Sequence, residues 1–152
     1  MNRNVQGLIA GAIATAVLSA LMLIKGAMGL LPQFNVIAML AGTLGGGPIV
    51  GWIAHVAIGV VLYGLAIANL SHVLPGGSAT VKGIVLGVIG WLAMMLVAMP
   101  VMGGGFFASD LGVPVVVATL VLHLIFGAVL GFGFGRLGGD GGPAPQQPAP
   151  GG

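Results

Sequence analysis

Hydrophobic residues dominate the chain in long runs, and polar residues gather in the short segments between them. Four runs stand out, and they cover residues 5–24, 49–70, 81–102 and 113–134. Each run is close to the ~20 residues that an α-helix needs to cross the hydrocarbon core of a bilayer. A lipid-embedded backbone must satisfy its own hydrogen bonds, and runs of this length do so as helices. The pattern therefore predicts an all-α polytopic membrane protein, a four-helix bundle.

The connections between the runs also carry structural signals. The first connection is itself apolar, is interrupted by Pro32, and has a central part, residues 35–44, that is too short to span a membrane. We expect residues 35–44 to form a short interfacial or re-entrant helix. In the third connection, Ser109 or Asp110 can supply a side-chain oxygen that caps the fourth helix.

The composition agrees with a protein dissolved in lipid. Of the 152 residues, 58% are hydrophobic and 4% are charged, whereas soluble domains contain about 25% charged residues. We expect residues 1–137 to form one transmembrane domain, with no separate soluble catalytic domain. Residues 138–152, rich in Gly and Pro, are predicted to be a disordered cytoplasmic tail.

The few charges predict an orientation and limit the partners. Arg3, Lys82 and Arg136 fall on one side of the four runs, and Lys25 falls on the other. By the positive-inside rule both termini are cytoplasmic. The chain has no basic patch, so nucleic acid is not an expected partner. It has no Cys either, which excludes disulfides, thiolate metal sites and iron–sulfur clusters.

Glycine and histidine recur in a pattern that favours a repeated helical hairpin. A Gly-x3-Gly motif opens the first and third runs, at residues 7–11 and 83–87, and a His-x3-Gly motif marks the second and fourth, at residues 55–59 and 123–127. Two hairpins in one orientation would be related by an axis along the membrane normal. Chance recurrence in a chain with 30 glycines is the alternative. Small residues at these spacings predict closely packed helices.

His55 and His123 lie inside the second and fourth runs, and an intramembrane ionisable residue is a functional-site hypothesis by default. One hypothesis is a bis-histidine haem b, with both imidazoles as axial ligands and with Gly59 and Gly127 leaving space for the ring. Thr15, Ser19 and Tyr63 are further candidates for hydrogen bonds in this region, but basic partners for the haem propionates are lacking.

Two other interpretations of the histidines stay open. Met95 and Met99 can join His55 and His123 in a copper site, because thioethers and imidazoles suit Cu(I); methionine also fills apolar gaps. Alternatively, each histidine forms a structural hydrogen bond across a helix interface, at an average gain of ~0.6 kcal/mol. His72, at the end of the second run, is expected to be an interfacial residue with no ligand role.

The absence of acidic residues from the four runs disfavours several classes of function. The acids, Asp110 and Asp140, lie outside the runs, so neither a carboxylate proton relay nor a Ser-His-Asp triad can be assembled there. An enzyme acting alone is not expected, although a place in a redox complex stays open. We predict an accessory or assembly subunit that packs in the bilayer against other membrane subunits or against itself. The alternative is an electron-transfer haem b protein that uses His55 and His123.

Four stretches carry a resemblance to a known family: GLIAGAIATAVLSALM, LLPQFNVIAMLAG, GWIAHVAIGVVLYG and TLVLHLIFGAVLGFGFGRLG. Together they resemble an uncharacterised family of small bacterial membrane proteins with four predicted spans, over residues 5–137. The resemblance implies a bacterial cytoplasmic (inner) membrane location. It brings no known activity, cofactor or catalytic residue.

Overall fold

The computed structural model describes residues 1–139, which form helices and connecting turns. The predicted tail, residues 138–152, lies almost entirely outside the described residues. In chain order the elements are α1 (Arg3–Ala27), α2 (Val36–Thr43), α3 (Pro48–Val56), η1 (Ala57–Leu62), α4 (Tyr63–Leu70), α5 (Ala79–Ala93), η2 (Met94–Ala98), α6 (Met99–Val101), η3 (Phe106–Ala108) and α7 (Val113–Arg136). Segments η1 and η2 are π-helical, and η3 is a 3-10 turn.

These elements make four helices that are long and apolar enough to cross a membrane, Arg3–Ala27, Pro48–Leu70, Ala79–Val101 and Val113–Arg136. They confirm the four predicted spans. The short helix expected over residues 35–44 is also present, as α2.

Polar side chains set the first turns of three helices. The side-chain oxygens of Asn2, Asn35 and Ser78 accept hydrogen bonds from backbone N–H groups three residues ahead, at the starts of α1, α2 and α5. Such caps satisfy donors that have no partner inside the helix.

The predicted side-chain cap of the fourth span is wrong. α7 starts after Gly112, which has φ 91°, and no side chain caps it. The hydroxyl of Ser109 instead donates to the carboxylate of Asp110 at 3.2 Å. Pro114 lies in the first turn of α7, where the missing N–H removes one donor that would otherwise need a partner.

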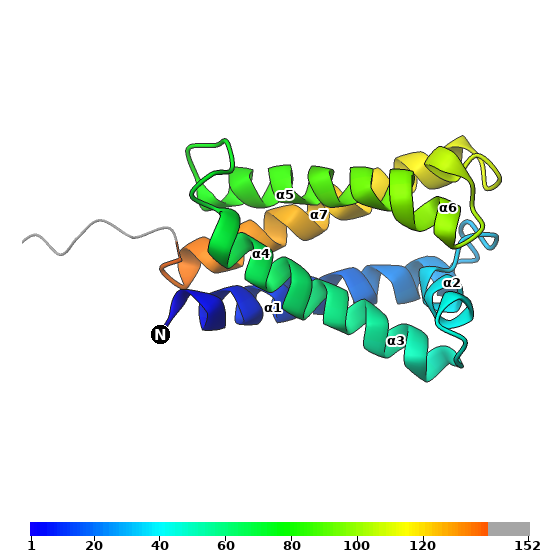
Figure 1. The fold of residues 1–152 in the computed structure, drawn as a ribbon, viewed down its shortest axis with the longest axis horizontal. Helices are drawn as coiled ribbons and strands as arrows, with labels where there is room; N and C mark the ends of the chain where they lie inside the picture. The colour runs from blue at the N-terminus through cyan, green and yellow to red at the C-terminus, as the bar shows by residue number, and fades with distance from the viewer. Residues whose placement is uncertain (140–152) are drawn as a thin grey trace, which may run out of the picture.

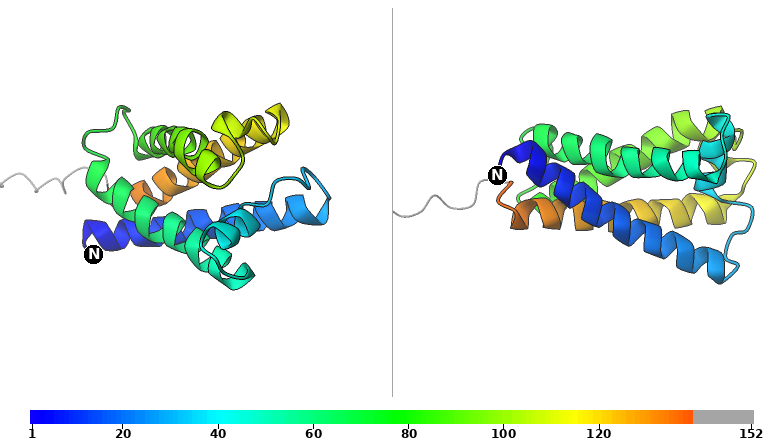
Figure 2. Two further views of the ribbon diagram at one scale, coloured as in Figure 1. Left: turned by 45° about the vertical axis from the view of Figure 1, so that its right-hand side comes forward. Right: turned by 90° about the horizontal axis from the view of Figure 1, so that it is seen from below.

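The spans form two hairpins that run side by side along the molecule (Figure 1). Hairpin one consists of α1 with α3, η1 and α4, and hairpin two consists of α5, η2 and α6 with α7. We call the end that holds the N-terminus and the turn at residues 71–78 the N-terminal end, and the end that holds α2 and η3 the distal end. The hairpins converge toward the N-terminal end and diverge toward the distal end (Figures 1 and 2).

Glycines bring the two helices of each hairpin into backbone contact. In hairpin one, a side chain on Gly7 would overlap the carbonyl oxygen of Gly64. In hairpin two, a side chain on Gly83 would overlap the carbonyl oxygen of Gly127, and one on Gly87 would overlap that of His123. Both Gly-x3-Gly motifs therefore allow close backbone packing within a hairpin, and the glycine-rich faces lie inside the hairpins.

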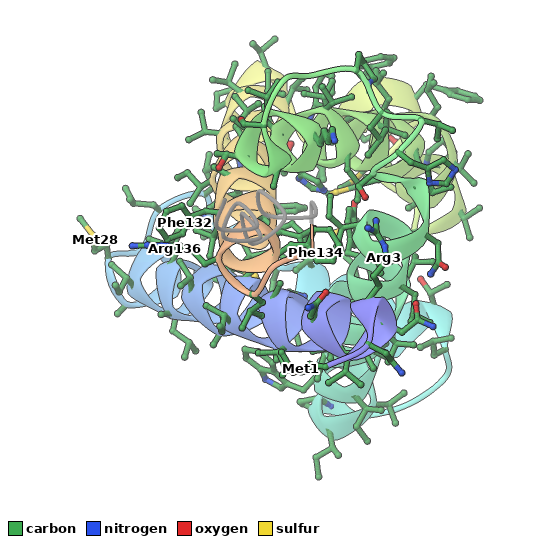
Figure 3. The ribbon with its side chains drawn as sticks, turned by 90° about the vertical axis from the view of Figure 1, so that its left-hand side faces the viewer. Met1, Arg3, Met28, Phe132, Phe134 and Arg136 are labelled. Atoms are coloured by element: carbon green, nitrogen blue, oxygen red, sulfur yellow. The ribbon has the colours of Figure 1, made fainter. Side chains whose placement is uncertain are left out.

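Arg3 ties the helix ends together at the N-terminal end. Its guanidinium donates to the carbonyl of Ala68 at 3.0 and 3.1 Å, to the hydroxyl of Ser71 at 2.7 Å and to the carbonyl of Gly139 at 2.7 Å. It also lies 5.5 Å from the ring centroid of Phe134, and Figure 3 shows the two side chains close together. A cation beside the last carbonyls of a helix is stabilising, because these carbonyls lack intrahelical donors.

The third span changes character before Pro100. Proline has no N–H to bond the carbonyl four residues earlier, so a regular α-helix cannot continue through this position unchanged. The chain passes through the π-helical segment η2 and then ends the span at Val101. The span therefore ends one residue after Pro100.

Two hydrophobic cores hold the bundle. The first, which we call the inter-hairpin core, joins α1, α4, α5 and α7 toward the N-terminal end, and comprises Ala10, Ala14, Ile67, Ala68, Leu86, Phe126, Leu130 and Phe134. The second, the distal core, comprises Phe34, Met95, Met99, Ala108 and Val115. Phe34 belongs to the α1–α2 connection, so the distal core joins hairpin one to hairpin two.

We predict that Gly83→Ala destabilises the protein, because the added methyl group would overlap the Gly127 carbonyl and lie within 2.6 Å of the Gly131 backbone. Overpacking of this kind costs about 1–3 kcal/mol. The measurement is the thermal unfolding midpoint in mild detergent. Gly26→Ala is the matched control, since Gly26 also lies in a helix and has open space around it. Equal midpoints for the two variants would contradict the close backbone contact.

Candidate functional site

A large cavity of about 1370 Å³ lies between the two hairpins. All four spans contribute to its wall, with Thr15 and Leu18 from α1, Trp52 from α3, Gly90 from α5 and Leu122 from α7 among the lining residues. The wall is mainly apolar. A cavity of this kind is the default binding-site hypothesis in a protein of unknown activity.

Aromatic residues close the cavity toward the N-terminal end. The rings of Tyr63 and Phe126 meet edge to face, with centroids 4.9 Å apart. Tyr63 reaches across to hairpin two, where a side chain on Gly90 would overlap its hydroxyl. The absence of a side chain at position 90 therefore makes room for this tyrosine.

The α1–α2 connection and α2 close the cavity at the distal end, and we call residues 29–42 the distal lid. Phe34 inserts into the distal core, where it is 5% exposed. The ammonium of Lys25 donates to the carbonyls of Leu30, Leu31 and Phe34, at 3.1, 3.3 and 2.9 Å. These three bonds use the three N–H donors of the ammonium and hold the lid against the end of α1.

The cavity opens sideways, between η1 and the α5–η2 stretch. Ile58 and Leu62 on one edge, and Ile89 and Val97 on the other, line the cavity and are solvent-exposed in the isolated chain. Leu62 is 62% exposed and Val97 is 64% exposed. In a membrane-spanning bundle such apolar edges face hydrocarbon, so the opening leads into the bilayer.

The two histidines line this one cavity from different hairpins. His55 is 8% exposed; its Nε2 lies 3.2 Å from the hydroxyl of Ser19, and its ring centroid lies 5.7 Å from that of Trp52. Nδ1 of His123 donates to the carbonyl of Thr119 at 2.8 Å. A carbonyl only accepts, so Nδ1 carries the proton and Nε2 of a neutral His123 is an acceptor.

The candidate glycines serve helix packing. A side chain on Gly59 would overlap the hydroxyl of Thr15, and one on Gly127 would overlap the backbone of Gly83. Gly59 lines the cavity, whereas Gly127 does not. The structure therefore assigns Gly127 to the α5–α7 contact rather than to space for a cofactor ring.

Met95 and Met99 do not line the cavity that the histidines line. Both thioethers are fully buried in the distal core, and the methionines that line the cavity are Met22, Met94 and Met102. Within residues 1–139 no group of three or more His, Asp or Glu side chains is placed to hold a metal ion. The proposed copper ligands are thus split between two places in the fold.

Sequence reasoning missed two interactions of the site. One is the attachment of the distal lid to Lys25, the lone cation in the last turn of α1. The other is a hydrogen-bond chain on hairpin two, in which Nε1 of Trp91 donates to the Thr119 hydroxyl at 3.3 Å and this hydroxyl donates to the carbonyl of Val115 at 2.8 Å. It places Trp91 inside the bundle beside the residue that holds His123.

Fold and site together define an all-helical, multi-pass membrane protein with an apolar cavity between two hairpins. The chain belongs to the family of unknown function DUF6789, which matches it over residues 1–143. The expected membership of an uncharacterised family is confirmed. No curated protein and no solved structure matches the chain.

Adjacent methionines offer a test of the cavity boundary. We predict that Met94→Trp leaves the thermal unfolding midpoint nearly unchanged, because residue 94 lines the cavity and the larger ring has space there. Met95→Trp should destabilise the protein by about 1–3 kcal/mol, the cost of overpacking a filled core, since Met95 is fully buried. If Met94→Trp lowered the unfolding midpoint more than Met95→Trp does, the assignment of residue 94 to the cavity wall would be wrong.

Proposed function

We propose that this chain is a non-catalytic accessory protein of the bacterial inner membrane, and that it holds an apolar molecule, taken sideways from the bilayer, in the cavity between its hairpins. The observation that carries the proposal is the lateral opening between Leu62 and Val97. An apolar cavity with such an opening is accessible to lipid-soluble molecules, and the distal lid separates it from the water at that end.

The chemistry of the lining supports binding rather than catalysis. Among the described lining residues are hydroxyls, two imidazoles and one ammonium, but no carboxylate. Hydrolytic triads and proton relays use a carboxylate to orient or move the proton. The lining therefore offers hydrogen bonds for orientation and an apolar wall for affinity.

An accessory subunit would contact its partner through the outer surface of the bundle. The glycine-rich faces are used within the hairpins, so a partner subunit, or a second copy of the chain, would meet the exposed apolar surfaces instead. The two edges of the lateral opening are the strongest such surface, because a partner helix placed there would also cover the cavity. In this proposal the charges set both termini in the cytoplasm, with Arg3, Lys82 and Arg136 near the N-terminal end and Lys25 toward the distal end.

We predict that Ala93→Trp lowers the amount of lipid-soluble material that copurifies with the protein, because Ala93 lines the cavity and a ring there would fill it. The measurement is mass spectrometry of the organic extract, per mole of protein purified in mild detergent. Ala12→Trp is the matched control, since Ala12 is an exposed helical residue that does not line the cavity. Equal extracts from the two variants would overturn the binding function.

A haem b protein is the second candidate, favoured by the position of His55 and His123 on one cavity wall from two hairpins. These imidazoles would hold the iron, and haem when bound would supply one-electron transfer. The hydrogen bond from Nδ1 of His123 to the Thr119 carbonyl is the kind of outer contact that orients a ligating imidazole. The fit is incomplete, because the Lys25 ammonium, which would pair with a propionate, is engaged by three lid carbonyls.

The haem candidate predicts a reduced-minus-oxidised absorption difference of about one haem b per chain in the protein purified from haem-replete cells. His55→Ala and His123→Ala should each abolish it. His72→Ala, outside the cavity lining, should retain the full signal. A spectrum without haem bands, or full haem content in both cavity variants, would remove the ligand assignment.

A further inference from the structure

The polar groups inside the cavity carry information about the molecule it holds, and the inference here rests on the proposed binding function. The first group is Lys25, whose ammonium donates to three carbonyls of the distal lid. No carboxylate is found among the described lining residues. A cationic head group inside the cavity would thus lack a counter-charge, and burial of an unpaired charge is strongly unfavourable. The Lys25 ammonium keeps its charge, but its three donors are used, so an anionic head group would find no free hydrogen-bond donor on it. These two constraints favour an uncharged ligand.

The second group is His123. Because Nδ1 donates to the Thr119 carbonyl, Nε2 presents a lone pair, and no hydrogen-bond partner for Nε2 is found within residues 1–139. An acceptor in a water-poor site is best satisfied by a donor on the ligand. The simplest uncharged donor on a lipid is a hydroxyl.

The third group is Tyr63, which lines the same cavity from hairpin one. Its hydroxyl meets Gly90 across the bundle, and no hydrogen bond of this hydroxyl is found in the described part of the chain. A phenolic hydroxyl both donates and accepts. It can therefore donate to the oxygen of a ligand hydroxyl or to a neighbouring carbonyl of the same head group.

The size and the route of access indicate what is attached to the head group. The volume of about 1370 Å³ exceeds the ~300–1,000 Å³ of ordinary small-molecule pockets. Ile58 and Leu62 continue the apolar wall to the lipid-facing surface, so a hydrocarbon chain can leave through the lateral opening while the head group stays inside.

We propose that the cavity binds an uncharged lipid whose head group carries a hydroxyl, with that hydroxyl donating to Nε2 of His123 and with the Tyr63 hydroxyl donating to an oxygen of the same head group. Two kinds of membrane lipid have this chemistry, hydroquinones with an apolar tail and diacylglycerols. Both combine a neutral hydroxyl with long chains, and they differ in whether the head group is an aromatic ring or a glycerol ester.

The test uses the full-length protein in mild detergent and measures probe occupancy by native mass spectrometry. The probes are dodecylhydroquinone, its dimethyl ether and dioctanoylglycerol. The dimethyl ether keeps the ring and the tail and removes both hydroxyl donors. We expect a hydroxyl-bearing probe to bind at least about fivefold more tightly than the ether, which is the effect of one neutral hydrogen bond.

Two variants assign the contacts. Tyr63→Phe removes only the hydroxyl, and His123→Leu removes the acceptor while keeping an apolar side chain of similar reach. Each should weaken the binding of the hydroxyl-bearing probe about fivefold. His123→Leu should leave the ether unchanged, because the ether has no donor for Nε2, whereas Tyr63→Phe should weaken the ether as well, because an ether oxygen still accepts from the tyrosine hydroxyl. His72→Leu is the matched histidine control, because His72 does not line the cavity, and it should bind as the unaltered protein does. Tyr63→Phe keeps the test decisive even if the variant at position 123 unfolds.

The outcomes separate the two proposals. If only dodecylhydroquinone binds more tightly than the ether, the natural ligand is a hydroquinone lipid. If only dioctanoylglycerol binds more tightly than the ether, the natural ligand is a diacylglycerol. Equal binding of dodecylhydroquinone and its ether, with no tighter binding of dioctanoylglycerol, would overturn the hydroxyl-lipid assignment and leave the proposed binding function standing. Binding of no probe, together with equal organic extracts from Ala93→Trp and Ala12→Trp, would overturn both.

Discussion

Backbone-to-backbone packing at glycines is the constraint on which the rest of this structure depends. In hydrocarbon, helices gain little from hiding apolar side chains, because lipid tails are equally apolar, so they associate through close van der Waals contact. Gly7 with Gly64, and Gly83 with Gly127, give each hairpin that contact. Between the hairpins, such close contact is confined to the N-terminal end.

The separation between hairpins is not uniform along the molecule. Toward the N-terminal end, small residues such as Ala10 and Ala14 let α1 approach α7, and the guanidinium of Arg3 joins the ends of α4 and α7. Toward the distal end, Tyr63 and Phe126 stand between the hairpins, and the π-helical segments η1 and η2 interrupt regular helix geometry on the two edges of the opening. π-Helical turns are frequent at functional sites, and here both of them border the same cavity.

The distal lid bounds the cavity that this divergence creates. Without it, the diverging hairpins would leave a cleft open to water. Phe34 in the distal core and Lys25 on the lid carbonyls hold the connection across that end. Under the proposed function, a site reached from lipid suits an amphipathic lipid more than a water-soluble substrate. The histidines would then be polar contacts in an apolar wall.

The sequence by itself determined the membrane character, the four spans with their ends to within three residues, the short helix at residues 36–43, and the close packing at the Gly-x3-Gly motifs. These features follow from local hydropathy and from side-chain size, which can be read residue by residue. It also named His55, His123, Ser19 and Tyr63 as candidates for one region. Only the tertiary structure decided that Gly127 packs against α5, that Met95 and Met99 lie in a separate core, and that Phe34 closes the site across hairpins. These depend on how each helix is rotated about its axis and where the connection folds back. In a chain that is apolar on nearly every face, hydropathy does not reveal that rotation.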